Sequence, residues 1–324
     1  MSLRLDDYWI WDFWFAQDGP DTHIFFLHAP RSLGDPELRH HAARIGHAVS
    51  RDLVNWAPLA PPFGAGPPGS HDDLATWTGS VLEHDGLWHM FYTGISTREG
   101  GAVQRILHAT SPDLLSWDKS PDVVEADSRW YESAGQDEGD IAWRDPWVFY
   151  DEESAAFHML ITARANTGPA DGRGVIGHAV SPDLSRWSVR APLSEPGDFF
   201  FLEVPQLIRI GGVWRVLFCV PPDGHSARRL AGGNAGALGG THYLVGREKL
   251  GPYSLVDEPF FVGDSSASLY AGRILEHNGR LLFFASRNYD ASGHFHGELI
   301  DPVPVAIAAD GRLVATEATR YLVR

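Results

Sequence analysis

The sequence predicts an all-β protein that folds as a single five-bladed β-propeller spanning residues 1–324. Three observations lead to this prediction: a strand-and-turn segment recurs along the chain, a hairpin of two apolar strands recurs five times, and helical periodicity is almost absent. A chain of 324 residues can bury a large core as one all-β domain without disulfides. The rival fold, a β-sandwich, would not require a five-fold hairpin period.

The strand-and-turn segment has three clear copies and a weaker fourth. They lie at 45–56 (IGHAVSRDLVNW), 106–117 (ILHATSPDLLSW), 176–187 (IGHAVSPDLSRW) and, less clearly, 243–254. Alternating apolar residues predict a half-buried strand, and the Ser-Pro-Asp or Ser-Arg-Asp that follows supplies turn chemistry. The repeated His47, His108 and His178 hold one place in three separate units, so we interpret them as structural and expect no metal site.

The recurring hairpins define the blades. Their first strands are expected at 9–16, 77–83, 143–150, 203–210 and 270–276, and their second strands at 23–29, 87–93, 156–162, 213–220 and 280–286. The blades themselves are expected near 1–74, 75–140, 141–198, 199–266 and 267–324. We expect residues 312–324 to add a closing strand to the ring.

Carboxylates open three of the five first strands. Asp12, Asp145 and Glu203 each lie among apolar residues, and an acid in such surroundings is costly unless it is paired or used. Since the first strand of each blade faces the central channel, the three side chains are expected to share one site. Glycoside cleavage needs two carboxyl groups beside the scissile bond, and a third can bind sugar hydroxyls and support developing positive charge. The alternative is a set of strand-end acids that cap turns.

The segments that contain these acids resemble those of clan J glycoside hydrolases, the β-fructosidases of families 32 and 68. The matching segments are 9–14 (WIWDFW), 144–146 (RDP) and 203–205 (EVP), and 77–80 (WTGS) is similar to a motif at the sugar site of these families. Their order on separate repeats agrees with the family pattern. The resemblance covers nearly the whole chain as a propeller, without the C-terminal β-sandwich that is typical of family 32.

The resemblance implies a role for each matching residue. It assigns Asp12 as the nucleophile, Asp145 as the residue that binds ring hydroxyls and stabilises the transition state, and Glu203 as the acid/base. Further substrate contacts are expected from Trp11, Trp77, Thr78, Arg144 and Tyr270. For Arg144 a second possibility is that it steadies a carboxylate, and for Tyr270, which opens the fifth repeat strand, core packing is an equal alternative.

The implied activity is retaining hydrolysis of terminal β-furanosides, with β-fructofuranosides as the first choice. The sequence departs from the family pattern at Phe13, Trp14, Val204 and His28. These positions surround the sugar, so a β-D-arabinofuranosidase stays open, as does a transferase that passes the glycosyl group to a sugar acceptor. A non-catalytic sugar-binding propeller is the alternative from another class.

Composition restricts the partners. The formal net charge is −16, and Lys119 and Lys249 are the only lysines. Such a surface repels nucleic acid and anionic lipid, so we expect a carbohydrate partner, no cofactor, and neither nucleic acid nor membrane. The N-terminal segment lacks the features of a signal peptide, which leads us to expect a cytoplasmic protein. The lone Cys219 is interpreted as a buried structural thiol, and the sequence does not indicate an oligomeric state.

Overall fold

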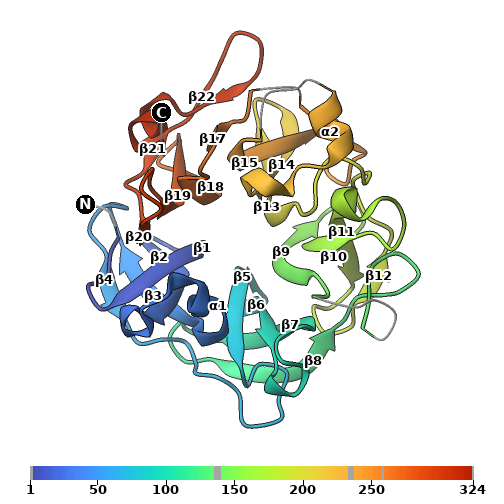
Figure 1. Cartoon of the computed structure of the whole chain (residues 1–324). Coiled ribbons are helices and arrows are strands. Elements are labelled where there is room, and N and C mark those ends of the chain that lie inside the picture. Colours follow the sequence, from blue (N-terminus) through green and yellow to red (C-terminus); the bar gives the residue numbers. More distant parts are fainter. Residues whose placement is uncertain (1–2, 135–139, 233–236, 257–258, 323–324) are drawn as a thin grey trace.

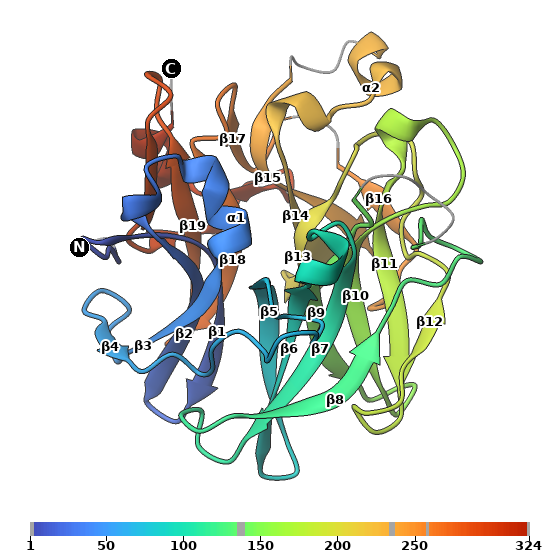
Figure 2. The same ribbon diagram turned by 60° about the horizontal axis from the view of Figure 1, so that its bottom comes forward.

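Five β-sheets are arranged like blades around a common axis in the computed structural model (Figure 1), which describes residues 3–134, 140–232, 237–256 and 259–322. The strand of each blade that comes first in the sequence lies next to the axis, and later strands lie progressively outward (Figures 1 and 2). The predicted all-β, five-bladed propeller is therefore confirmed.

Within each blade neighbouring strands run antiparallel, and the three inner strands follow one another in the sequence. Blade 1 contains β1 (Tyr8–Asp18), β2 (Asp21–Pro30), β3 (Arg44–Ser50) and β4 (Ala57–Leu59), and blade 2 contains β5 (Ala75–His84), β6 (Leu87–Ile95), β7 (Gln104–Ser111) and β8 (Asp118–Val124). Blade 3 contains β9 (Trp143–Asp151), β10 (Ala156–Arg164), β11 (Gly174–Ser181) and β12 (Ser188–Arg190). Blade 4 contains β13 (Glu203–Ile210), β14 (Val213–Val220), β15 (Gly239–Gly246), β16 (Tyr253–Leu255) and β17 (Val262–Asp264). Blade 5 contains β18 (Leu269–His277), β19 (Arg280–Tyr289), β20 (Phe295–Leu299) and β21 (Val303–Pro304).

Helical segments are short and lie in the connections. They are η1 (Arg31–Leu33), η2 (Pro36–Leu38), α1 (Arg39–Ala42), η3 (Thr97–Glu99), η4 (Ala170–Gly172), η5 (Pro222–Gly224), α2 (Ala227–Ala231) and η6 (Thr316–Tyr321). Among the residues described, none of these helices has the length and apolar character needed to cross a membrane.

The ring closes differently from the prediction for residues 312–324. In the described part of this segment, β23 (Leu313–Val314) pairs with β22 (Ala306–Ile307) as a separate hairpin, and η6 follows it. Leu3 near the N-terminus instead bridges Leu299 of β20, with a backbone hydrogen bond of 2.9 Å. The expected closing strand is therefore wrong: the short strand β23 pairs with its neighbour in the sequence, and Leu3 pairs with blade 5.

The hydrophobic core is divided among the blade interfaces. Each of five clusters of buried side chains joins neighbouring blades, including one that joins blade 5 to blade 1. In that last cluster, Phe13 and Phe26 of blade 1 lie with Leu282 and Phe284 of blade 5. Burial of apolar surface is the main stabilising force. The contact between blades 5 and 1 that closes the ring is therefore stabilised in the same way as the other blade interfaces.

The repeated segment identified in the sequence contains the turn between the third and fourth strands of a blade. In blade 2, Asp113 accepts hydrogen bonds from the backbone N–H groups of Leu115 and Ser116, at 2.9 and 2.8 Å. Leu114 in between has a left-handed φ of 63°, and Trp117 donates its indole N–H to the Leu114 carbonyl. The Trp117 ring then packs edge-on against Phe25 of blade 1. The turn thus directs each repeated Trp into a blade interface.

The repeated histidines lie in separate blades, and each contacts a second histidine of its own blade. The pairs are His23 with His47, His89 with His108, and His158 with His178, with ring nitrogens 2.8, 3.0 and 2.9 Å apart. No group of three potential metal ligands occurs within the described ranges. These contacts agree with the structural interpretation of the three histidines.

Candidate active site

A β-bulge interrupts the inner strand of every blade. The register shifts fall between Trp11 and Phe13 in β1, between Trp77 and Gly79 in β5, at 145–146 in β9, between Glu203 and Gln206 in β13, and between Tyr270 and Arg273 in β18. At four of these bulges a residue other than glycine has a left-handed φ: Asp12 (28°), Asp145 (57°), Val204 (53°) and Ala271 (51°). Such conformations are costly, and bulges redirect side chains beside active sites.

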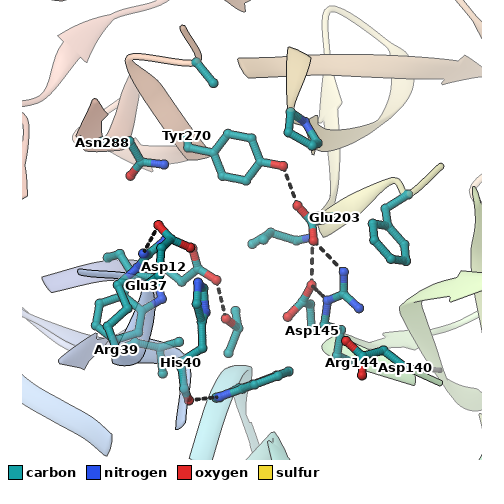
Figure 3. A pocket seen from close by; sticks show the side chains of 18 of the residues that line it. Asp12, Glu37, Arg39, His40, Asp140, Arg144, Asp145, Glu203, Tyr270 and Asn288 are labelled. Atoms are coloured by element: carbon teal, nitrogen blue, oxygen red, sulfur yellow. Dashed lines mark hydrogen bonds and ion pairs between the residues drawn. The ribbon is translucent and has the colours of Figure 1, made fainter. Parts of the chain in front are cut away.

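The bulges face one cavity of about 930 Å³. All eight residues that the sequence predicts as catalytic or substrate-binding line this cavity: Trp11, Asp12, Trp77, Thr78, Arg144, Asp145, Glu203 and Tyr270. Figure 3 shows that Asp12, Asp145 and Glu203 approach it from three different blades. The propeller thereby brings together acids that lie far apart in the sequence.

Asp12 is half-buried and receives one strong hydrogen bond. The Thr78 hydroxyl donates to Asp12 Oδ2 over 2.6 Å. Burial, together with the negative charges of Asp145 and Glu203, raises the pKa of Asp12 to about 7, although the Thr78 bond and the charge of Arg273 act in the opposite direction. Asp12 is therefore poised to change its protonation state near neutral pH.

Asp145 is held by donors from two blades. The Thr162 hydroxyl donates to Asp145 Oδ2 over 2.8 Å, and the backbone N–H of Val204 donates to the same oxygen over 3.2 Å. The Arg144 guanidinium lies 3.6 Å away. Burial nevertheless raises the pKa of Asp145 above its usual value. These contacts fix the orientation of the carboxylate at the floor of the cavity.

Glu203 is held between a cation and a phenol. Arg144 Nη2 donates to Glu203 Oε1 over 2.5 Å, and the Tyr270 hydroxyl donates to Glu203 Oε2. Burial alone would lower the pKa of Arg144, but the charges of Glu203 and Asp145 raise it. Burial and the neighbouring Glu203 charge raise the pKa of Tyr270 well above its usual value. Arg144 and Tyr270 are therefore both available as donors to Glu203.

Aromatic rings and the loop before β3 form another side of the cavity. The Trp77 indole N–H donates to the His40 carbonyl over 2.7 Å, and the His40 ring lies edge-on to both Trp11 and Trp77. Burial lowers the pKa of His40 to about 3, so its imidazole is neutral. Next to it, Arg39 pairs with Glu37 over 3.1 Å. Flat rings beside polar groups form a surface suited to a sugar.

Several supporting residues were not predicted from the sequence. They are Thr162, Thr93, Gln104 and Arg273, together with Glu37, Arg39 and His40 of the loop. Thr93 and Thr162 occupy equivalent places in the second strands of their hairpins (HMFYT and HMLIT), so the repeat itself carries a signal for them. Arg273 is a charged residue inside an apolar strand, the same signal that identified the three acids. For the loop residues the sequence carries no comparable pattern.

A comparison with protein-family models identifies the family. The model of the glycosyl hydrolases family 32 N-terminal domain matches residues 21–288. The chain belongs to this family. The predicted resemblance to families 32 and 68 is thus confirmed. Asp145 and Glu203 of this family 32 chain lie within the matched residues, whereas Asp12 precedes them, so the place of Asp12 in the site rests on its geometry.

Curated relatives of this family 32 chain include invertases and fructosyltransferases. The raffinose invertase of Escherichia coli is 26% identical over 218 residues, which make up 64% of this chain and 41% of that protein. The 6(G)-fructosyltransferase of Asparagus officinalis is 36% identical over 108 residues, 31% of this chain and 16% of that protein. The match therefore spans less than half the length of these relatives.

Solved structures show the same fold. The inulosucrase from Halalkalicoccus jeotgali bound to kestose superposes with a TM-score of 0.78 at 24% identity, covering 98% of this family 32 chain and 89% of that one. The levansucrase of Bacillus subtilis has a TM-score of 0.72 at 12% identity, covering 96% and 87%. At these identities the likeness establishes the propeller fold alone.

Proposed function

We propose that the chain is a retaining β-furanosidase whose preferred substrates are terminal β-fructofuranosides. The observation that carries this proposal is the meeting of Asp12, Asp145 and Glu203 in one cavity of a family 32 chain. Curated relatives named as invertases and β-fructofuranosidases support fructose as the glycone.

The mechanism uses the three carboxylates in distinct roles. The Asp12 carboxylate attacks the anomeric carbon while Glu203 donates its proton to the leaving oxygen, so that the glycosidic bond breaks and a glycosyl ester forms. Glu203 then removes a proton from water, the water oxygen attacks the anomeric carbon, and the ester bond to Asp12 breaks. Asp145 binds ring hydroxyls and stabilises the positive charge that develops on the sugar.

The roles of Asp12 and Glu203 are separable by the leaving group. The phenol released from an aryl β-D-fructofuranoside needs little protonation to leave, whereas the glucose released from sucrose needs a proton from the enzyme. We expect Asp12→Ala to lose activity on both substrates, and Glu203→Ala to lose far more on sucrose than on an aryl substrate with an acidic phenol. Asp223→Ala, which removes a carboxylate from the rim of the same cavity, serves as the matched control and should retain activity on both.

The substrate panel also decides among the alternatives. It includes aryl β-D-arabinofuranosides beside the fructosides, and NMR of the first-formed sugar reports retention or inversion. Release of arabinose without fructose would mean that arabinose is the preferred glycone, and the proposed mechanism would stay the same. Sugar binding without cleavage of any member would contradict the proposal and indicate a binding module.

Transfer to a sugar acceptor is a second candidate, because fructosyltransferases occur among the curated relatives. Hydrolysis and transfer share the glycosyl ester and differ in what attacks it. At high sucrose concentration, the ratio of free fructose to free glucose distinguishes them: a ratio near one indicates hydrolysis, and a deficit of fructose indicates transfer.

A further inference from the structure

Arg273 is a completely buried cation beneath the candidate site. It lies in β18, the inner strand of blade 5, and its side chain has 0% relative exposure. The bulge before it places Tyr270 against Glu203 and turns Arg273 toward the axis of the propeller. The backbone of this bulge requires glycine at position 272, because a Cβ there would lie 2.2 Å from the Thr241 hydroxyl oxygen and 2.5 Å from the Phe283 ring.

The Arg273 guanidinium contacts the chain close to each of the three acids. Its Nε donates to the carbonyl of Phe13, which follows Asp12, over 3.2 Å. Its Nη1 donates to the carbonyl of Pro205, in the bulge that begins at Glu203, over 2.7 Å. Its Cζ lies 5.0 Å from the centre of the Trp147 ring, two residues after Asp145. A single side chain of blade 5 therefore connects the inner strands of blades 1, 3 and 4.

The charge of Arg273 acts on the same acids. Burial lowers the pKa of Arg273 to about 10, so the group remains a cation at neutral pH. This cation lowers the pKa of Asp12, in opposition to burial and to the negative charges of Asp145 and Glu203. Blades 1, 3 and 4 thus supply the carboxylates, and blade 5 supplies a buried positive charge beneath them.

We propose that Arg273 is a positioning residue that holds the bulges of blades 1 and 4 in place and favours the ionised form of Asp12 for nucleophilic attack. The proposal rests on the function proposed above for Asp12. An Arg is suited to this place because its planar fork reaches two carbonyls while it retains its charge in a buried site. Burial of a cation is costly without such partners.

Other groups around the two residues also bear on the pH dependence. Asp12 faces Asp145 and Glu203, and Thr78 donates to it. Arg273 faces Asp12, Asp145 and Cys219. Arg144 and Tyr270 reach the cluster through Glu203. Substitutions are therefore confined to Arg273, so that these groups stay unchanged.

The test follows the ionisation of Asp12 in two independent ways. The first is the acidic limb of kcat/KM against pH with an aryl β-D-fructofuranoside, which reports groups of the free enzyme. The second is NMR titration of protein labelled with ¹³C at aspartate carboxyl groups, in which the Asp12 signal is the one missing from Asp12→Asn. Arg273→Met should move both midpoints to higher pH by about one unit. Its loss of kcat/KM should then be about tenfold greater at pH 6 than at pH 9.

Two variants separate charge from structure. Arg273→Lys keeps the cation, so its midpoints should stay close to those of the parent. Arg215→Met is the matched control, because Arg215 is also buried and donates to backbone carbonyls, of Ile210 and Gly311, away from the cavity. It should lose stability without moving either midpoint. If Arg273→Met does not fold, Arg273→Gln removes the charge while keeping a donor.

The proposal is overturned if the charge-removing variant titrates at the same pH as the parent and loses activity equally at every pH. Failure of the furanosidase proposal has a different signature, because no furanoside would then be cleaved by the parent itself. The NMR midpoint of Asp12 needs no substrate, so it tests the electrostatic role of Arg273 in either case.

Discussion

Thr78, Arg144 and Tyr270 bind the side chains of the candidate catalytic acids. The sequence predicts all three as sugar contacts, and all three line the cavity. In the structure Thr78 donates to Asp12, whereas Arg144 and Tyr270 donate to Glu203. For Arg144 this is the second of the two roles considered from the sequence. These residues therefore set the orientation of the carboxylates, whatever contact they make with substrate.

A substitution at Thr78 tests this role. Thr78→Val keeps the shape of the side chain but removes the hydrogen bond that lowers the pKa of Asp12. Since Asp12 must be ionised to attack, a higher pKa moves the acidic limb of kcat/KM to higher pH, and activity at pH 6 falls more than activity at pH 9. The pH profile with an aryl β-fructofuranoside measures the shift. Thr22→Val, a buried threonine in β2 that does not line the cavity, should leave the limb unchanged.

At the level of the strand, four of the five bulges are faced by a small residue of the neighbouring strand. Thr93, Thr162, Cys219 and Ser286 pair in register with Trp77, Arg144, Glu203 and Tyr270 respectively. Three of them carry hydroxyls that bond to bulge residues, as when Ser286 donates to the Tyr270 carbonyl over 2.9 Å. Cys219 holds the equivalent place in blade 4, completely buried, which confirms its interpretation as a buried thiol.

The repeated turn between the third and fourth strands of a blade also has a testable role, which we consider in blade 2. Asp113 accepts two backbone N–H bonds, and these bonds hold the pKa of Asp113 below its usual value. Asp113→Ala should leave these donors without their partner and lower Tm by roughly 2 °C or more, with little effect on kcat. Differential scanning calorimetry measures the change. Asp118→Ala, an exposed residue of β8 in the same blade, provides the control, and an equal Tm in the two variants would contradict the role of the turn.

For the whole molecule, stability is coupled to pH through buried histidines. Burial lowers the pKa of six of them in the folded state to about 3 or 4: His28, His40, His47, His108, His178 and His242. The unfolded chain binds these protons below about pH 6.5, whereas the folded chain does not. Their contribution to stability is therefore fully present above pH 6.5 and is lost as pH falls toward 3 to 4. Asp12 and Asp145 act with the opposite sign, because their raised pKa values favour the folded state at low pH.

We expect the six histidines to dominate, because they outnumber the two opposing carboxyl groups. The free energy of unfolding should decrease from pH 7 to pH 5, and its slope should correspond to an uptake of several protons on unfolding. Urea denaturation at a series of pH values measures the slope. His178→Gln removes one such group and should make the slope shallower. An unfolding free energy that is constant between pH 7 and pH 5 would contradict this account.

The sequence by itself determined the five-fold architecture and the identity of the three acids. Alternating apolar strands, turn residues and a repeated Trp are local patterns, so the inner strands 9–16, 143–150 and 203–210 were predicted within two residues of β1, β9 and β13. Asp12, Asp145 and Glu203 were recognisable because an acid in an apolar strand is costly unless it has a use.

Only the tertiary structure decided how the acids are held. The bond from Thr78 to Asp12 joins residues 66 apart, the bond from Tyr270 to Glu203 joins residues 67 apart, and the bond from Arg273 to Phe13 joins residues 260 apart. Such contacts depend on where a bulge turns one side chain and on which blades meet when the ring closes. Burial likewise sets the pKa of Asp12, because the cost of a charge depends on the atoms packed around it in space rather than on its neighbours in the chain.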